Sequence, residues 1–179
     1  MDFIQFILDH GAHKAGVVKV ADIPFDAALR KACEVNACGK YGMNHTCPPH
    51  VGEIENLVAR AQGYETLYLF QTIGQLEDSY DFEGMMEASS VHKSITQAVA
   101  DELPIPDCLV LSAGGCNLCE RCAVLDDAPC RIPDRALASL ESYGINVSKT
   151  AALAGMKYVN GVNTVTYFSG IFIHKEGGE

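Results

Sequence analysis

Four of the eight cysteines in this chain lie within a stretch of fifteen residues. Cys116, Cys119 and Cys122 are separated by two residues each, and seven residues lie between Cys122 and Cys130. Thiolates this close together can bind a metal, form a disulfide or carry out redox chemistry. A zinc ion usually takes its four ligands from two separated pairs, whereas one unbroken run of thiolates suits a [4Fe–4S] cluster, in which each thiolate binds its own iron. The spacing therefore predicts an iron–sulfur cluster on these four residues, with a zinc ion, or else unliganded or disulfide-paired cysteines, as the alternatives.

The residues around this run bear on the same prediction. The C-x2-C-x2-C run is the one that holds a [4Fe–4S] cluster in bacterial ferredoxins, so this loop resembles half of a ferredoxin. In ferredoxins the fourth cysteine comes after three residues and is followed directly by proline, whereas Pro133 lies three positions after Cys130 here. Cys130 therefore departs from that pattern, while the first three cysteines follow it. Gly114 and Gly115, which precede the run, allow the backbone to approach a cluster closely.

Three further cysteines lie earlier in the chain. Cys33, Cys38 and Cys47 are separated by four and eight residues, and Pro48-Pro49 follows directly. The two prolines restrict the backbone, as suits a fixed ligand loop. Three thiolates can bind three irons of a second [4Fe–4S] cluster and leave the fourth iron to another ligand. These cysteines are therefore candidate ligands of a second cluster, and a zinc site or plain buried thiols are the alternatives.

The fourth ligand of this earlier site decides what the site could do. The candidates are His45, His50, Cys108 and a small exogenous molecule. A protein ligand would make the site an electron carrier, whereas an open iron would bind a small thiol, sulfide or carboxylate substrate. In the second case Tyr41, His45 and His50 are the candidate catalytic groups, because a histidine can transfer protons near neutral pH. Three cysteines with His45 or His50 could instead hold zinc.

The remaining candidates have simpler interpretations. Cys108 lies in an apolar segment and resembles a packed small hydrophobic residue. We expect four other histidines at the surface or in polar contacts, namely His10, His13, His92 and His174. Arg131, next to Cys130, is either a surface residue or a charge that offsets a cluster.

Hydrophobic periodicity predicts the elements that hold these loops. Strands are expected over residues 15–23, 66–73, 107–115 and 164–174, and helices over residues 3–10, 24–32, 52–61, 79–103 and 134–144. Alternating strands and helices are typical of an α/β domain in which a layered sheet is flanked by helices. We expect residues 1–179 to form a single domain, with the two cysteine-rich metal loops at strand or helix ends. The pattern does not give the order of the strands.

Composition narrows the class of protein further. The 179 residues are 48% hydrophobic and 20% charged, as in ordinary soluble domains, and no apolar run reaches the length of a membrane helix. The formal net charge of −10 argues against a nucleic-acid partner. The N-terminus lacks the basic and apolar regions of a secretory signal, so we expect a cytoplasmic protein. In a reducing cytoplasm, closely spaced cysteines bind metal or do redox chemistry more often than they form disulfides.

Together the two cysteine motifs resemble those of a known family. The first reads Cys-x4-Cys-x2-Tyr-Gly-x4-Cys-Pro-Pro, and the second reads Gly-Gly-Cys-x2-Cys-x2-Cys-x7-Cys-Arg-x-Pro. The matching residues are Cys33, Cys38, Tyr41, Gly42, Cys47, Pro48 and Pro49, and then Cys116, Cys119, Cys122, Cys130 and Pro133. This order is similar to that of a prokaryotic family of small cysteine-rich proteins known only as predicted metal-binding proteins, and the likeness runs from about Ala15 to His174.

The resemblance implies an iron–sulfur or other metal protein, of a kind commonest in anaerobes, and it implies no particular substrate. We therefore expect a cytoplasmic iron–sulfur protein with one or two [4Fe–4S] clusters that exchanges electrons with a redox partner protein. Two alternatives stay open: an iron–sulfur enzyme with an open iron at Cys33, Cys38 and Cys47, and a zinc-binding structural module.

Overall fold

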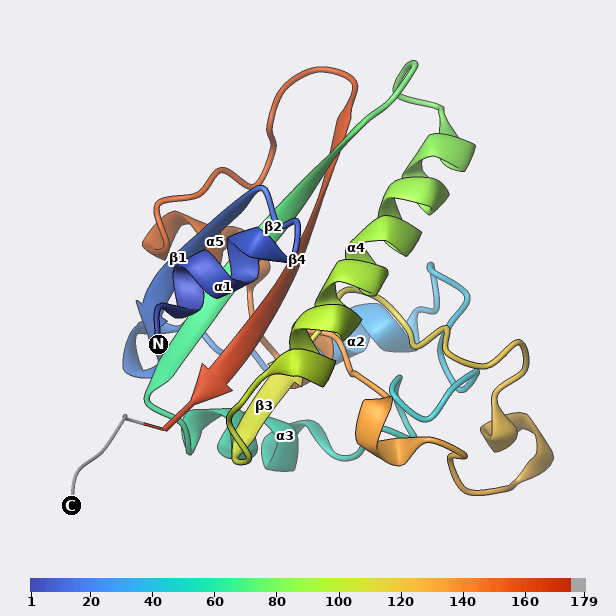
Figure 1. Cartoon of the computed structure of the whole chain (residues 1–179). Helices are drawn as coiled ribbons and strands as arrows, with labels where there is room; N and C mark the ends of the chain where they lie inside the picture. Colours follow the sequence, from blue (N-terminus) through green and yellow to red (C-terminus); the bar gives the residue numbers. More distant parts are fainter. Residues whose placement is uncertain (175–179) are drawn as a thin grey trace.

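A four-stranded antiparallel sheet lies at the centre of the computed structural model, which describes residues 1–174 (Figure 1). Its strands are β1 (Lys14–Lys19), β2 (Thr66–Gln75), β3 (Cys108–Leu111) and β4 (Thr164–Ile173). They lie in the order β1-β2-β4-β3, and each neighbouring pair is antiparallel. The long strands β2 and β4 are paired over their whole length, so the sheet is built around these two apolar strands.

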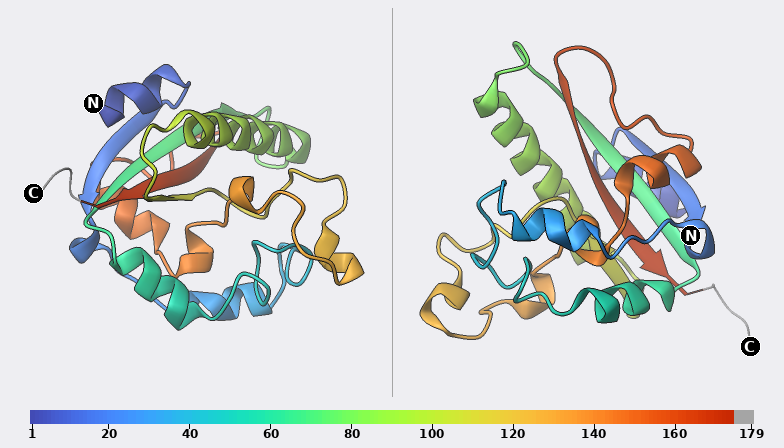
Figure 2. Two further views of the ribbon diagram at one scale, coloured as in Figure 1. Left: turned by 60° about the horizontal axis from the view of Figure 1, so that its bottom comes forward. Right: turned by 180° about the vertical axis from the view of Figure 1, so that it is seen from behind.

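Helices cover both faces of the sheet (Figure 2). The α-helices of the described residues are α1 (Phe3–Asp9), α2 (Leu29–Glu34), α3 (Ile54–Gln62), α4 (Phe82–Glu102) and α5 (Val147–Leu153). Helices α1 and α4 pack on the face that carries Phe70, and α3 and α5 pack on the face that carries Leu69. These two neighbours belong to different cores because successive strand residues point to opposite faces. The predicted α/β fold, a layered sheet with flanking helices, is confirmed.

A buried polar network fixes α4 on the sheet. Nδ1 of His92 lies 2.8 Å from Oγ1 of Thr72 on β2, and Nε2 lies 2.7 Å from Oγ of Ser169 on β4. Burial lowers the pKa of His92 to about 4, so its imidazole is neutral near pH 7. His92 therefore makes the polar contacts that we expected, but it makes them inside the core rather than at the surface. Neither α4 nor any other helix in residues 1–174 is long and apolar enough to cross a membrane.

Most of the predicted elements are present, although several ends differ. The helices predicted over residues 3–10, 52–61 and 79–103 correspond to α1, α3 and α4, and the strands predicted over residues 66–73 and 164–174 correspond to β2 and β4. The strand predicted over residues 15–23 ends at Lys19, and Val20–Asp22 forms a 3-10 helix instead. The helix expected directly after Pro24 begins only at Leu29.

The helix predicted over residues 134–144 is wrong. That region holds two 3-10 helices, Pro133–Arg135 and Glu141–Tyr143. Between them the chain pairs with the residue after β3: the Ser112 N–H donates to the Ala138 carbonyl at 2.7 Å, and the Leu140 N–H donates to the Ser112 carbonyl at 3.1 Å. Backbone groups used in this way are not free to make helical bonds, so the segment crosses the sheet edge in an irregular conformation.

Candidate metal centre

The cysteines of the second loop, residues 114–133, surround one small cavity. Its walls are formed by His45, Thr46, Cys116, Cys119, Cys122, Cys130, Ile132 and Ala136. All four cysteines are half-buried. The cavity has a volume of about 20 Å³, so a group larger than a single ion would be bound only with movement of the surrounding side chains. The structure therefore brings the four predicted ligands to one space.

The start of the second loop is fixed by the end of β3 and by two glycines. Gly114 takes a left-handed conformation with φ of +65°, which glycine adopts without strain. Gly115 then passes the first loop, residues 33–50, so closely that an added Cβ would lie 2.9 Å from Nδ2 of Asn44 and 3.3 Å from Sγ of Cys47. The glycines thus turn the chain and allow its backbone to lie directly against the first loop.

The seven residues between Cys122 and Cys130 form a compact turn. Ala123–Asp126 is a 3-10 helix in which Ala123 and Val124 are buried. The Ala128 N–H donates to the Ala123 carbonyl at 3.1 Å, so the turn carries the chain back toward the other cysteines. This buried turn accounts for a gap that is longer than the gap in the ferredoxin pattern.

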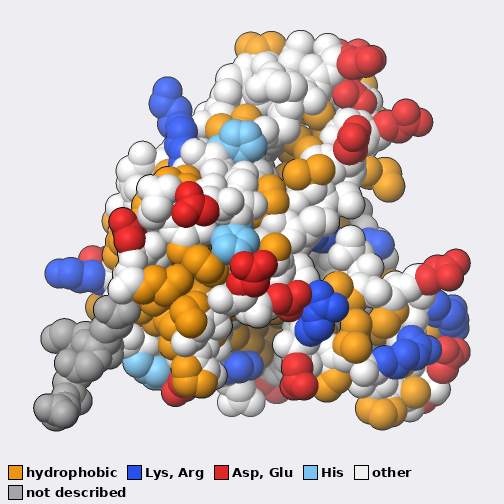
Figure 3. Space-filling model, viewed as in Figure 1, with side chains coloured by type: hydrophobic (Ala, Val, Ile, Leu, Met, Phe, Trp, Pro, Cys, Tyr) orange, Lys and Arg blue, Asp and Glu red, His pale blue; other side chains and the backbone are white. Residues whose placement is uncertain are grey.

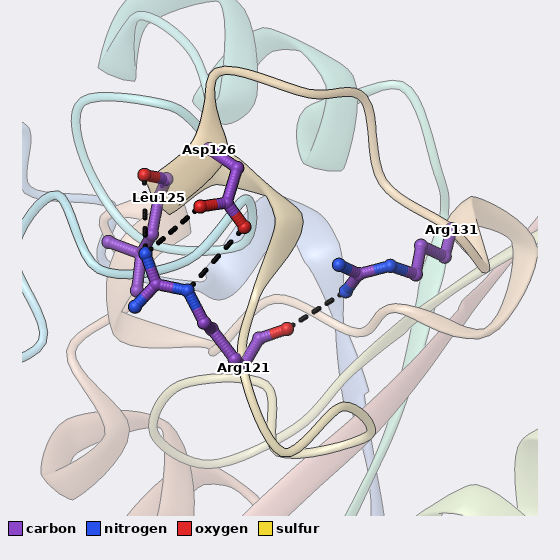
Figure 4. A network of polar contacts seen from close by, with 4 residues as sticks. All are labelled: Arg121, Leu125, Asp126 and Arg131. Atoms are coloured by element: carbon purple, nitrogen blue, oxygen red, sulfur yellow. Dashed lines mark hydrogen bonds and ion pairs between the residues drawn. The ribbon is translucent and has the colours of Figure 1, made fainter.

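Two arginines make polar contacts on the outer side of this turn (Figure 4). The Arg121 guanidinium forms an ion pair with Asp126 at 3.1 Å and also contacts the Leu125 carbonyl. The exposed Arg131 donates to the backbone carbonyl of Arg121 at 2.9 Å. Of the two interpretations of Arg131, the structure therefore favours a surface residue, and it adds a role in joining the two sides of the turn.

Burial dominates the electrostatics of Cys116. It raises the pKa of this thiol above the ordinary value of 9.0, a hydrogen bond from the Leu118 N–H lowers it, and the neighbouring cysteines raise it again. In the free protein the thiol is therefore protonated at neutral pH. The Leu118 N–H is nevertheless in place to stabilise the thiolate that a metal requires.

The three cysteines of the first loop also lie together. Cys33 is half-buried near the end of α2, Cys47 is half-buried, and Cys38 is exposed. Burial raises the pKa of Cys33 and of Cys47, and the Cys38 thiol adds to the rise in each. The Gly42 N–H donates to the Pro48 carbonyl at 2.8 Å, which closes the loop that carries Cys38 and Cys47. The structure thus groups this predicted trio and leaves one of its thiols open to solvent.

Polar side chains contact the first-loop thiols. A hydrogen bond from the Asn44 side chain lowers the pKa of Cys47 against the effect of burial. The positive charge of the Arg30 guanidinium, which donates to the Gly52 carbonyl at 2.9 Å, lowers the pKa of Cys33 against the effect of burial. The Nε–H of Arg30 is buried and has no hydrogen-bond partner within residues 1–174. A negatively charged metal–thiolate group beside Cys33 would balance this charge, so the side chains present suit such a group.

The candidates for a fourth ligand of the first site are dispersed. His45 lines the cavity of the second loop, where its Nε2 lies 2.9 Å from the Ala128 carbonyl. His50 is exposed, and its ring centre lies 6.3 Å from that of His45. Cys108 lies in β3, 3.6 Å from the Ile105 carbonyl, and packs against the core beneath α1 and α4, as expected for a small hydrophobic residue. His45 therefore accompanies the second set of cysteines rather than the first.

The donor groups surround their sites without meeting at one point. In the part of the chain that the structure describes, no three His, Cys, Asp or Glu side chains are arranged to hold a metal ion directly. Tyr41, the other candidate for chemistry, is half-buried in the first loop, and its N–H donates to the Asn36 side chain at 3.0 Å. The described residues thus present two neighbouring groups of thiols rather than a preformed metal site.

The two cysteine loops share a wall, and they lie side by side at the lower right of Figure 1. The Cys116 N–H donates to Oγ1 of Thr46, the residue before Cys47, at 3.1 Å. Lys93 of α4 donates from Nζ to the Gly115 carbonyl at 2.7 Å. Sequence reasoning missed Lys93, because it belongs to a helix far from both motifs and no pattern marks it.

Two adjacent sets of thiols on an α/β scaffold are the features of a cysteine-rich metal-binding protein. The chain belongs to the DUF2284 family, described as a predicted metal-binding protein, whose family model matches residues 16–173 and so includes all eight cysteines. The resemblance inferred from the two motifs is thereby confirmed. No curated protein and no solved structure matches the chain.

Proposed function

We propose that this protein binds a [4Fe–4S] cluster through the four cysteines of the second loop and carries electrons between partner proteins in the cytoplasm, as part of anaerobic metabolism. The observation that carries the proposal is that one short loop presents four thiols to a single cavity. A second cluster on the three cysteines of the first loop is the larger form of the same proposal. We take the whole chain to act as one domain in this role.

A bound cluster would supply one-electron redox chemistry. The residues of the chain would do the rest: the thiols lose their protons and bind iron, and the Leu118 N–H and the Asn44 side chain donate to the sulfurs of Cys116 and Cys47. Such hydrogen bonds, together with burial, set the reduction potential of a cluster. The electron would come from a one-electron donor protein and pass to a one-electron acceptor protein.

Anaerobic purification followed by iron, sulfide and zinc analysis tests the proposal. One cluster corresponds to about four irons and four sulfides per chain, and two clusters correspond to about eight of each. We expect a brown protein with an EPR signal that appears on reduction with dithionite and disappears on reoxidation. Cys108→Ser is the matched control, since Cys108 belongs to β3 and packs against the core beneath α1 and α4, and its removal should leave the iron content unchanged. A protein that binds no iron would contradict the proposal.

The exposed Cys38 favours a second candidate function, at the first loop. An iron held by three thiols near the surface could bind a small thiol, sulfide or carboxylate in its open position, which would make the protein an enzyme. Tyr41 and His50 would then be the polar groups of the same loop. The anaerobic protein should change its visible spectrum when such a molecule is added, and Cys38→Ser should abolish the change. An unchanged wild-type spectrum would rule out this second function.

The small volume of the cavity in the second loop favours zinc binding as a third candidate function. In that case the protein would be a structural or interaction module. It would be colourless and contain about one or two zinc ions per chain. The same elemental analysis therefore separates this candidate from the other two.

A further inference from the structure

Lys93 lies where the two cysteine sites meet. It follows His92 on α4, and the buried contacts of His92 fix the rotation of the helix. The Lys93 ammonium donates to the carbonyl of Gly115, the residue directly before Cys116. An added Cβ on the same glycine would lie 3.3 Å from the Cys47 sulfur. One ammonium group therefore contacts the strip of backbone that separates the two sites.

The charge of Lys93 has no carboxylate partner in the described residues. The side chain is half-buried, so burial lowers its pKa, and the nearby ammonium of Lys40 lowers it further. Thiolates at Cys116 and Cys47, which would form on metal binding, would act in the opposite direction. A partly desolvated cation requires a compensating negative charge. The groups placed to supply that charge are the two cysteine sites themselves.

A surface groove of about 360 Å³ between α4 and the second loop is lined by Lys93 together with Cys116 and Arg135. The lobe formed by the two loops stands at the lower right of Figure 3, beside the body that α4 covers. Arg135 is already paired with Asp101 at 2.7 Å. Of the two basic residues in this groove, Lys93 is therefore the one whose charge is available to the metal sites.

We infer that Lys93 is a counter-cation shared by both metal sites and that it raises the reduction potential of each. This inference rests on the proposed function in its two-cluster form. Reduction adds a negative charge to a metal–thiolate group, and a nearby positive charge stabilises the reduced form more than the oxidised form. Lys93 contacts the common wall rather than a ligand, so it acts on both sites through its charge and not by binding metal.

Redox titration of both clusters, followed by EPR, tests the inference in Lys93→Met, Lys93→Gln and Lys93→Arg. The two neutral variants should lower the ratio of reduced to oxidised cluster at a fixed potential by roughly 15- to 20-fold at each site, as expected for one charge about 10 Å away at an effective dielectric constant of about 20. The arginine variant should stay near the wild type. Lys149→Met, which removes an exposed lysine on the opposite face of the sheet, is the matched control.

The possible results separate clearly. A shift at one site alone would refute the shared role, and a shift at neither would reduce Lys93 to a structural contact between α4 and the loop. A wild-type protein with one redox-active cluster would also refute the shared role, yet it would leave the proposed function standing. A wild-type protein without iron would refute the proposed function itself.

Discussion

The two cysteine loops differ in how completely they enclose their site. The second loop places four half-buried thiols around one cavity, over the buried residues Ala123 and Val124. The first loop offers three thiols, with Cys38 exposed and Arg30 as the charged neighbour of Cys33. A closed ligand set suits a stable electron carrier, whereas an open position allows another molecule to bind. The comparison suggests that one chain combines a closed and an open thiol site across a common wall.

Removing one thiol from either loop should have the largest effect on metal content, and each variant should lose the metal of its own loop only. In Cys119→Ser we expect the loss of the whole second-loop group, about four irons per chain, while the first loop keeps its metal. In Cys38→Ser we expect the reverse, because the second loop has a complete set of its own ligands. Iron and sulfide analysis of the anaerobic proteins measures both effects. Loss of all the iron from either variant would show a single shared site instead of two.

The two loops should also differ in how steeply their metal uptake depends on pH. Burial raises the pKa of Cys33, Cys47 and Cys116 above 9.0, so in the free protein these thiols are protonated at neutral pH. Metal binding must release these protons. At pH values below the thiol pKa, the affinity for metal therefore increases as the pH is raised and decreases as the pH is lowered. Each released proton contributes about tenfold per pH unit, with about four protons at the second loop and about three at the first. Titration of the metal-free protein with Co²⁺ at several pH values measures the two slopes, and equal slopes would contradict the difference in ligand number.

Adding a methyl group to the wall between the loops should affect both sites. In Gly115→Ala the new Cβ would meet Asn44 and Cys47, and we expect a loss of roughly 1–3 kcal/mol in the free energy of unfolding with altered spectra at both sites. Gly114→Ala is the matched control. Its left-handed φ should lower the free energy of unfolding by about 1 kcal/mol. Its added Cβ would contact only Lys93, so the first-loop spectrum should not change. Chemical denaturation measures the loss of stability, and visible circular dichroism measures the spectra of the two sites. An unchanged first-loop spectrum in Gly115→Ala would contradict a wall shared by the two sites.

The smallest effect should come from the surface of the second loop. Arg131→Ala removes the hydrogen bond to the Arg121 carbonyl, and an exposed contact of this kind contributes little. We expect slightly faster release of metal from the second loop to a chelator and unchanged release from the first. A large change in the reduction potential would instead show that Arg131 offsets cluster charge, the other interpretation of its position.

The sequence predicted the elements that have a clear hydrophobic period. Strand β2 was predicted from its continuous apolar run, and helix α4 was predicted because its apolar residues repeat at the spacing of a helix. Helix α5 was missed, although Asn146 caps it by accepting a hydrogen bond from the Lys149 N–H, a local signal that could have marked its start. The false helix over residues 134–144 shows the opposite case, in which pairing with Ser112 overrides a helical pattern.

The candidate sites were likewise predictable only in part. Each group of cysteines was predicted from spacing, because short gaps keep ligands near one another whatever the fold. The contact between the groups was not predictable, since it depends on how Gly115 and Thr46 meet in three dimensions. His45 was assigned to the nearer motif in sequence, yet the fold places it at the cavity of the other loop. Which metal occupies these sites stays a prediction.

Residues 92–101 of α4 attach the lobe formed by the two cysteine loops to the rest of the molecule at two points. Lys93 bonds to Gly115 near one end of this segment, and Asp101 pairs with Arg135 at the other end, roughly 12 Å further along the helix axis. A single inserted residue between them would turn one anchor by about 100° relative to the other. This segment should therefore tolerate substitutions at positions that are neither buried nor used as anchors, but not changes in length. A transplant of the lobe onto another scaffold would need to carry these ten residues with it.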